Sequence, residues 1–335
     1  MGLFRSSPYF VARRVGRWRW PWFLGGLVVA LLGFFAVVTG ASIASAILEV
    51  AGSETVADAL APDAAAFPTA PLGLATLLLL TGASFWVPAI FATFTQRLPL
   101  KSLVAPARTF DWSLVWKALT AKALLFAVPV GLVLLAAPDD GGITFTGFGV
   151  RHLIWLPPML LIVLFQTSGE DVFFKGLLIH RLGALIPVLA VPPLLVVVLF
   201  TSLHLSNPDF QNLWPVLAIF ALNELVIVYF ILRTGGMEVA FVLHFVNNVV
   251  ALLLFGDATT QANELTLFVV ESPLSAENSF GQGLSAFIGA TFWQAVFVVA
   301  ISVERSPFYI ERFETFVPPP PVVDRQPVED GLPAL

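Results

Sequence analysis

One part of this sequence places polar and ionisable residues where apolar ones would be expected. Between residues 166 and 248, such side chains interrupt long runs of Leu, Val, Ile and Phe. Burying a charge in a bilayer is costly, so residues of this kind mark functional sites. Carboxylate, imidazole and amide groups can together activate a water molecule and stabilise an oxyanion, as peptide hydrolysis requires. The set comprises Glu170, Asp171, Lys175, His204, His244 and Asn248.

The spacing of these residues predicts which of them share a helix face. Positions four residues apart on an α-helix lie one above the other. His244 and Asn248 therefore point toward the same spot, and so do Asp171 and Lys175. We interpret the second pair as an ion pair that supports the site.

The composition predicts a membrane protein. Of the 335 residues, 58% are hydrophobic and 12% are charged, and the mean hydropathy is +0.88. A soluble domain carries about 25% charged residues, so this chain lacks the charge to cover a water-facing surface. We therefore expect the lipid bilayer as a partner. Nucleic acid is not expected, because the basic residues form no separate basic domain. The chain has no Cys, which excludes a thiolate nucleophile or a thiolate metal site.

A spanning helix needs about 20 mostly apolar residues. The sequence contains eight such segments, which predicts an all-α, polytopic bundle of about eight transmembrane helices. The segments are Trp22–Leu48, Leu72–Thr95, Trp116–Ala136, Leu153–Leu178, Pro192–Leu205, Leu213–Leu232, Val239–Phe255 and Leu284–Val303. The fifth is the least defined, because residues 182–191 could belong to it or form a connector.

Basic residues mark cytoplasmic loops, and here they predict the orientation. An arginine cluster precedes the first segment, and basic residues recur in every second connection, with Arg151 as the exception. Both termini are expected to be cytoplasmic, in a multi-pass protein of a bacterial cytoplasmic membrane. The predicted regions are a basic N-terminus (1–21), three helices with their loops (22–149), a catalytic core (150–256), an external loop (257–283), a last helix (284–304) and a cytoplasmic Pro-rich tail (305–335).

The depth of the polar residues depends on where the fifth segment begins. If it begins at Pro192, a favoured first helical position, then His204 lies about twelve residues into the helix at 1.5 Å per residue. Glu170 and His244 then fall at a comparable depth. A start at Gly183 would separate His204 from the other two.

Three short motifs resemble the signatures of one membrane protease family. Residues 170–176 (Glu-Asp-Val-Phe-Phe-Lys-Gly) are similar to Glu-Glu-x-x-x-Arg, residues 200–204 match Phe-x-x-x-His, and residues 244–248 match His-x-x-x-Asn. These are the motifs, in order, of the CAAX protease and bacteriocin-processing family (CPBP, or Abi). Two positions depart from the pattern: Asp171 replaces a Glu, and Lys175 replaces an Arg and so lacks its bidentate fork.

The resemblance implies an intramembrane endopeptidase that cuts a membrane-associated peptide or protein. In this chain Glu170 would be the general base, with His204 holding the attacking water, while His244 and Asn248 would donate hydrogen bonds to the oxyanion. Supporting roles fall to Asp171, Lys175 and Phe200. No cofactor is expected in this scheme.

Several alternatives remain open at this stage. Glu170, His204 and His244 could instead bind zinc, or the chain could be an inactive scaffold or a transporter. Glu224 could pair with Lys122, line the substrate cavity or lie near an interface. The substrate could be a prenylated CAAX protein, a leader peptide, a bacteriocin precursor or a membrane anchor.

Overall fold

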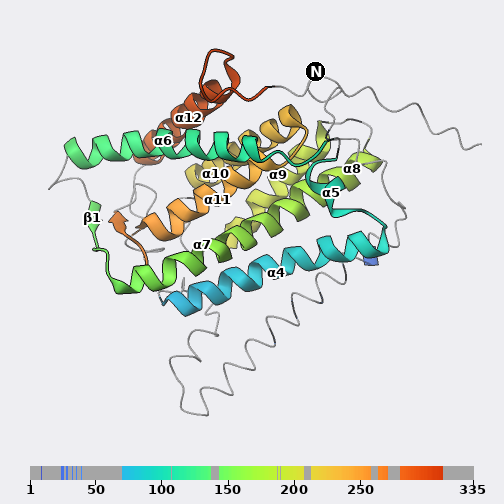
Figure 1. The fold of residues 1–335 in the computed structure, drawn as a ribbon, viewed down its shortest axis with the longest axis horizontal. Coiled ribbons are helices and arrows are strands. Elements are labelled where there is room, and N and C mark those ends of the chain that lie inside the picture. Colours follow the sequence, from blue (N-terminus) through green and yellow to red (C-terminus); the bar gives the residue numbers. More distant parts are fainter. Residues whose placement is uncertain are drawn as a thin grey trace, which may run out of the picture.

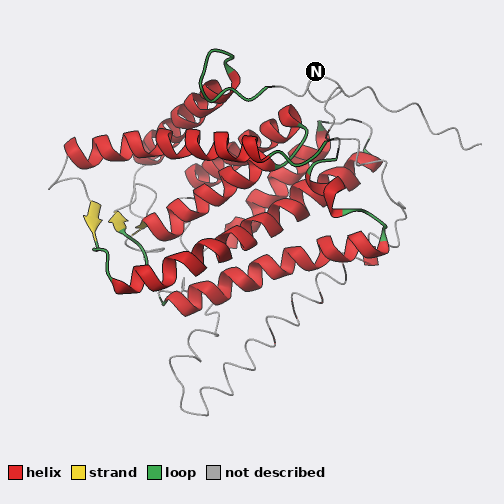
Figure 2. Ribbon diagram, in the orientation of Figure 1, coloured by secondary structure: helices red, strands yellow, loops and turns green. Residues whose placement is uncertain are grey.

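A computed structural model of the chain describes a helical bundle (Figures 1 and 2). It describes residues 70–106, 108–136, 143–186, 188, 190–206, 213–257, 263–270 and 280–311, together with positions 9, 24, 25, 28, 32, 35 and 39. The α-helices are α4 (Pro71–Thr95), α5 (Leu100–Val104), α6 (Trp112–Ala136), α7 (Val150–Asp171), α8 (Ile179–Leu185), α9 (Val191–Leu203), α10 (Leu213–Thr234), α11 (Glu238–Val249) and α12 (Phe280–Ser302). The remaining elements are the π-helices η2 (Val172–Leu178) and η4 (Val250–Leu254), the 3₁₀ turn η3 (His204–Ser206), and the strands β1 (Ile143–Phe145), β2 (Phe255–Asp257) and β3 (Phe268–Val270).

The long helices fall where the apolar segments predict them. Segments two to eight each coincide with a helix of the described chain, whereas Trp22–Leu48 lies largely outside the described residues. Three helices among the described residues are long and apolar enough to cross a membrane, namely Pro71–Thr95, Val150–Leu185 and Trp214–Thr234. Shorter apolar helices cover Val191–Leu203, Glu238–Leu254 and Phe287–Ser302. The total of eight spans stays a prediction.

The connection before the fifth predicted segment is divided between two elements. The fourth helix continues as α8 to Leu185, and α9 begins at Val191 with prolines in its first turn. Pro192 and Pro193 suit this position, because the first helical residues need no backbone N–H donor. The start near Pro192, on which the depth of His204 depends, is therefore confirmed.

The burial pattern is that of a protein surrounded by lipid. Large apolar side chains are exposed on the outside of the bundle, including Leu161 and Val198, while charged side chains such as Asp171 and Lys175 are fully buried. In water this distribution would be unstable, because exposed apolar area of this extent is unfavourable. In a bilayer the lipid tails cover the apolar faces, and the polar groups find partners inside the protein.

Helices α4 and α7 lie side by side along their length (Figure 1). Glycines permit this close approach: a Cβ on Gly169 would lie 2.9 Å from the Gly82 carbonyl oxygen and 2.7 Å from Cδ1 of Trp86. The Trp86 indole donates a hydrogen bond to the Phe165 carbonyl oxygen at 3.0 Å. Small residues at helix contacts are typical of membrane bundles. This contact fixes the helix that carries Glu170.

Three short strands correct the all-α prediction. They form a sheet in the order β1-β3-β2, with β1 antiparallel and β2 parallel to β3. The sheet joins Ile143–Phe145 to Phe268–Val270, which belongs to the predicted external loop. Strands of three residues are too short for an alternating pattern to be recognised, and their pairing partners are distant in sequence.

Two π-helical turns interrupt the helices that carry the polar residues. In η2 the Ile179 N–H bonds to the Phe174 carbonyl, five residues back, and in η4 the Phe255 N–H bonds likewise to Val250. The first π-turn begins directly after Asp171, and the second begins two residues after Asn248. Such turns occur frequently at functional sites, because they redirect side chains and free backbone carbonyls.

Candidate active site

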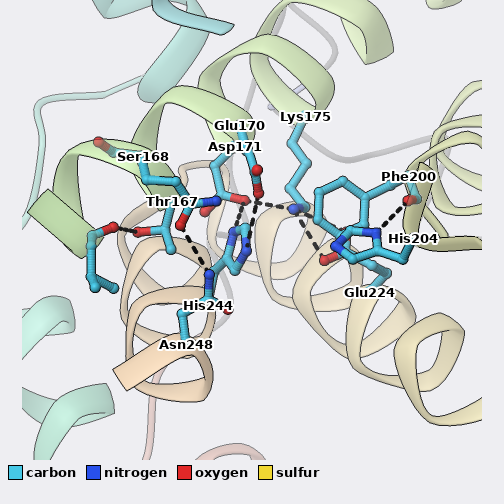
Figure 3. A network of polar contacts seen from close by, with 12 residues as sticks. Thr167, Ser168, Glu170, Asp171, Lys175, Phe200, His204, Glu224, His244 and Asn248 are labelled. Atoms are coloured by element: carbon cyan, nitrogen blue, oxygen red, sulfur yellow. Dashed lines mark hydrogen bonds and ion pairs between the residues drawn. The ribbon is translucent and has the colours of Figure 1, made fainter. Parts of the chain in front are cut away.

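Asp171 is the centre of a buried polar network (Figure 3). Its Oδ1 accepts a hydrogen bond from Lys175 Nζ at 2.5 Å and contacts His244 Nδ1 at 2.9 Å. The side chains of Asp171 and Lys175 are fully buried, which confirms the predicted ion pair. An ionised carboxylate can only accept hydrogen bonds, so Nδ1 of His244 is the donor.

This contact orients the other nitrogen of the His244 ring. Nε2 lies 3.4 Å from Oε2 of Glu170, and both side chains are 8% exposed. Because Nδ1 carries a proton, Nε2 donates only when the ring is protonated on both nitrogens. Glu170 and His244 are thus arranged to share a proton across a long contact. The sequence predicted that these two residues meet, and the structure brings them together.

His204 lies on the other side of Phe200. Its Nδ1 is 2.9 Å from the Phe200 carbonyl oxygen, which can only accept, so Nδ1 is protonated and Nε2 is left as an acceptor. The Phe200 ring lies 4.8 Å from the His204 ring and 5.7 Å from the His244 ring, centroid to centroid. Within the described chain, no hydrogen bond or ion pair joins His204 directly to Glu170. Phe200, which was predicted as a supporting residue, instead packs against the rings of both His204 and His244.

Asn248 is held by a residue to which sequence reasoning gave no role. Its Nδ2 donates to Oε1 of Gln166 at 3.0 Å. Gln166 is buried one turn before Glu170 in α7, so the two share a helix face. That i, i+4 relation was the signal that could have identified Gln166. The contact leaves one N–H of the Asn248 amide for another acceptor.

Glu224 closes the network from α10. Lys175 Nζ lies 2.9 Å from its Oε2 and 3.2 Å from its Oε1, and Lys175 stands between Asp171 and Glu224 in Figure 3. Of the alternatives for Glu224, pairing with Lys122 is therefore wrong. Lys122 instead lies over the Phe297 ring, 5.4 Å from its centroid. The Lys175 ammonium also lies 4.6 Å from the Phe200 ring centroid, a cation–π contact.

The start of α11, which carries His244, is fixed by a buried ion pair. Arg108 binds both carboxylate oxygens of Glu238, at 2.6 and 2.8 Å, and donates to the Thr234 carbonyl oxygen at 3.0 Å. The backbone N–H of Asp111 also donates to Glu238, at 2.8 Å. A bidentate pair of this kind specifies geometry as well as contributing energy. It joins the loop before α6 to the last residue of α10 and the first residue of α11.

Tyr9 contacts the network from the N-terminal region. Its side chain is fully buried, and its hydroxyl donates to the backbone carbonyls of Lys175, at 3.0 Å, and Leu103, at 3.2 Å. The Lys175 carbonyl lies in the π-turn η2. The Tyr9 ring also packs on His180, 4.4 Å between centroids. No feature of the sequence indicated this contact.

The two remaining histidines make no hydrogen bond to the network within the described residues, and both are buried. His152 is 8% exposed, and its Nδ1 accepts the Gly149 N–H at the start of α7. His180 is 1% exposed.

The side-chain arrangement does not match a zinc site. In the part of the chain that the structure describes, no three His, Asp or Glu side chains are arranged to hold a metal ion. The alternative ligands Glu170, His204 and His244 thus do not form the predicted zinc set in this geometry.

Comparison with known proteins places the network inside a family match. Residues 152–250 match the family described as type II CAAX prenyl endopeptidase Rce1-like. The YyaK protein of Bacillus subtilis (strain 168), described as uncharacterized, is 25% identical over 228 residues, which cover 65% of this chain and 69% of that protein. No solved structure matches the chain. The matched segment contains all four residues predicted to be catalytic, and the resemblance seen in the motifs is confirmed over this segment.

Proposed function

We propose that this chain is an intramembrane endopeptidase of the CAAX-protease type, acting on a membrane-associated peptide or protein. The observation that carries the proposal is the buried contact of Asp171, His244 and Glu170 within a segment that matches a peptidase family. Within the described chain, the Glu170 carboxylate has no ammonium or guanidinium partner, yet the His244 imidazole is directed at it. A purely structural network would not require this arrangement.

In the proposed reaction, Glu170 takes a proton from a water molecule whose oxygen attacks the scissile carbonyl carbon. The free Nε2 acceptor of His204 suits a position on the other side of that water. As the carbonyl becomes an oxyanion, it is stabilised by the second N–H of Asn248 and by Nε2–H of His244, whose ring is protonated on both nitrogens in this scheme. The C–N bond then breaks, and the proton on Glu170 passes to the leaving amine. The products are a new carboxylic acid and a new amine, which at neutral pH become a carboxylate and an ammonium by transfer of the acid's proton.

The supporting residues would orient these groups. Asp171 fixes the His244 ring through Nδ1, while Lys175 keeps Asp171 ionised. Phe200 packs between both histidines. Gln166 positions the Asn248 amide, a role we add to those inferred from the sequence. Preorganised donors of this kind avoid reorganisation during the reaction.

The test compares membrane proteomes of cells that express the wild type or Glu170→Gln, with ends of membrane proteins identified by mass spectrometry. We expect at least one substrate to remain uncut in the variant, and the same substrate to remain uncut with His204→Ala. Glu264→Gln is the matched control, because Glu264 is 44% exposed in a surface pair with Arg151, and such pairs contribute little. Full processing by Glu170→Gln would refute the proposal.

Two further arms address the alternatives. Activity of the purified protein that survives strong chelators, with no zinc in the preparation, would decide against the zinc-dependent form. The candidate substrates are a prenylated CAAX protein, a leader peptide, a bacteriocin precursor and a membrane anchor, and the uncut protein would identify the class. An inactive scaffold or transporter predicts identical proteomes for wild type and variant.

A further inference from the structure

Glu224 is the only acidic residue of α10, and its side chain contacts Lys175 of the site. Its side chain is 3% exposed, and both of its oxygens lie within 3.2 Å of Lys175 Nζ. A carboxylate in an apolar helix is retained only where it has a partner and a task. The family motifs at 170–176, 200–204 and 244–248 do not include it.

The charges of this network do not balance without His244. One ammonium, on Lys175, lies between two carboxylates, those of Asp171 and Glu224, and all three side chains are at most 3% exposed. The trio carries a net charge of −1 when ionised, from one positive and two negative groups. A buried net charge is costly unless a further hydrogen-bond donor contacts one of the charged groups. The donor that meets it is Nδ1 of His244, on Asp171.

Lys175 and His244 approach the same oxygen of Asp171. Both contacts are made to Oδ1, whereas Oδ2 is buried and has no hydrogen-bond partner in the described chain. An ammonium has three N–H donors and moves toward the strongest acceptors within reach. With Glu224 present, Lys175 is held from both sides. Without it, Lys175 would be free to bridge both oxygens of Asp171 and compete with His244.

We propose that Glu224 is a positioning residue, which holds Lys175 in place so that Asp171 can orient the His244 ring toward Glu170. This inference rests on the proposed function for its effect on catalysis, but its effect on the His244 ring does not depend on any reaction. The charged groups around that ring are Glu170 and Asp171 at its two nitrogens, with Lys175 and Glu224 behind Asp171. Glu224 thus affects the His244 ring only indirectly, through its contact with Lys175.

The kinetic test uses Glu224→Gln, which keeps the shape and removes the charge, and Glu224→Asp, which keeps the charge. A charge-assisted hydrogen bond is about twice as strong as a neutral one. Glu224→Gln lets Lys175 compete with His244 for Asp171, which weakens the Asp171–His244 contact. We therefore expect kcat of Glu224→Gln to fall about tenfold. KM is expected to be unchanged, because Glu224 does not touch the substrate. Glu224→Asp is expected to restore most of kcat. A rise in KM with unchanged kcat would overturn the proposal, since it would place Glu224 in the substrate cavity.

A double-mutant cycle separates action through Lys175 from other roles. In a Lys175→Met background, adding Glu224→Gln is expected to change kcat by less than about twofold, because the group through which Glu224 acts is absent. An added loss as large as that of the single variant would show an independent role and refute the inference. If the double variant does not fold, Glu224→Gln alone is compared with the wild type through the histidine spectrum, which requires no Lys175 variant.

The direct readout is ¹⁵N NMR of the histidine rings in detergent micelles. The chain has four histidines, so His244 can be assigned by single His→Gln substitutions. The wild type is expected to show a protonated, hydrogen-bonded Nδ1 at His244, and Glu224→Gln is expected to weaken or lose that signal. An unchanged His244 spectrum in Glu224→Gln refutes the inference. If the wild type cleaves no substrate but the His244 spectrum of Glu224→Gln differs from that of the wild type, the proposed function fails and the inference about Glu224 still holds.

Discussion

The contact between α4 and α7 gives a prediction that is independent of function. In Gly169→Ala, the new Cβ would lie 2.7 Å from Cδ1 of Trp86 and 2.9 Å from the carbonyl oxygen of Gly82. The Trp86 ring can turn only by giving up its hydrogen bond to Phe165, and the Gly82 oxygen belongs to the helix backbone. The two helices must therefore move apart, or the ring must leave its site.

The expected cost follows from three contributions. Overpacking a close contact costs about 1–3 kcal/mol, and a lost neutral hydrogen bond costs about 1 kcal/mol. Against these stands the better helix propensity of Ala, which contributes up to about 1 kcal/mol. Gly169→Ala is thus expected to lower the free energy of unfolding by about 1–3 kcal/mol. Since Glu170 is the next residue, activity should fall with it.

The measurement is unfolding by titration with SDS in mixed micelles, with Gly289→Ala as the matched control. Gly289 also lies inside a helix, α12, but a Cβ there would meet nothing within 4 Å. The control is expected to be neutral or stabilised by up to about 1 kcal/mol. If both variants are equally stable, the close approach of α4 and α7 at Gly169 is refuted.

Three other substitutions test the network and its supports. Asn248→Ala should lower kcat about 100- to 1,000-fold, as for a lost oxyanion donor. Gln166→Leu should lower kcat about tenfold or less, because one neutral hydrogen bond is lost. Steady-state kinetics on the identified substrate measure both values, and a larger loss for Gln166→Leu than for Asn248→Ala would contradict the assigned roles. Arg108→Ala leaves the buried Glu238 carboxylate without its counter-ion and should lower the free energy of unfolding by about 3 kcal/mol. Arg151→Ala, which removes an exposed pair, should lower it by less than about 1 kcal/mol. Equal losses of the two variants in SDS titration would contradict the burial of the Arg108–Glu238 pair. Tyr9→Phe removes a hydroxyl that donates to two backbone carbonyls and should cost about 1 kcal/mol; an unchanged SDS midpoint would argue against that contact.

The helices and most of the site follow from local patterns in the sequence. Apolar runs predict the long helices, because a bilayer requires about 20 apolar residues to span it. The i, i+4 rule predicts the Asp171–Lys175 pair, since both partners lie on one helix. The contact of Glu170 with His244 was predicted only from comparable depth and from the family resemblance.

The features that sequence reasoning missed depend on pairings between distant segments. Glu224 meets Lys175 across 49 positions, and Tyr9 meets the Lys175 carbonyl across 166; no periodicity connects residues so far apart. Charge balance could have indicated Glu224, because a buried Lys requires an acid. The small sheet was missed for a similar reason, because β1 and β3 are short and their paired residues Phe145 and Phe268 are 123 positions apart.

The π-turn η2 has an evolutionary consequence. A π-turn is equivalent to one extra residue inside an α-helix, so it arises or disappears by insertion or deletion rather than by substitution. Deleting one residue between 172 and 178 would restore an ordinary helix and rotate everything after it by about 100° relative to Glu170. Relatives without the extra residue would carry a gap at this point when aligned, directly beside the residues that define the family. Divergence within the family would then proceed partly by changes in helix length, which comparisons of residue identity alone do not detect.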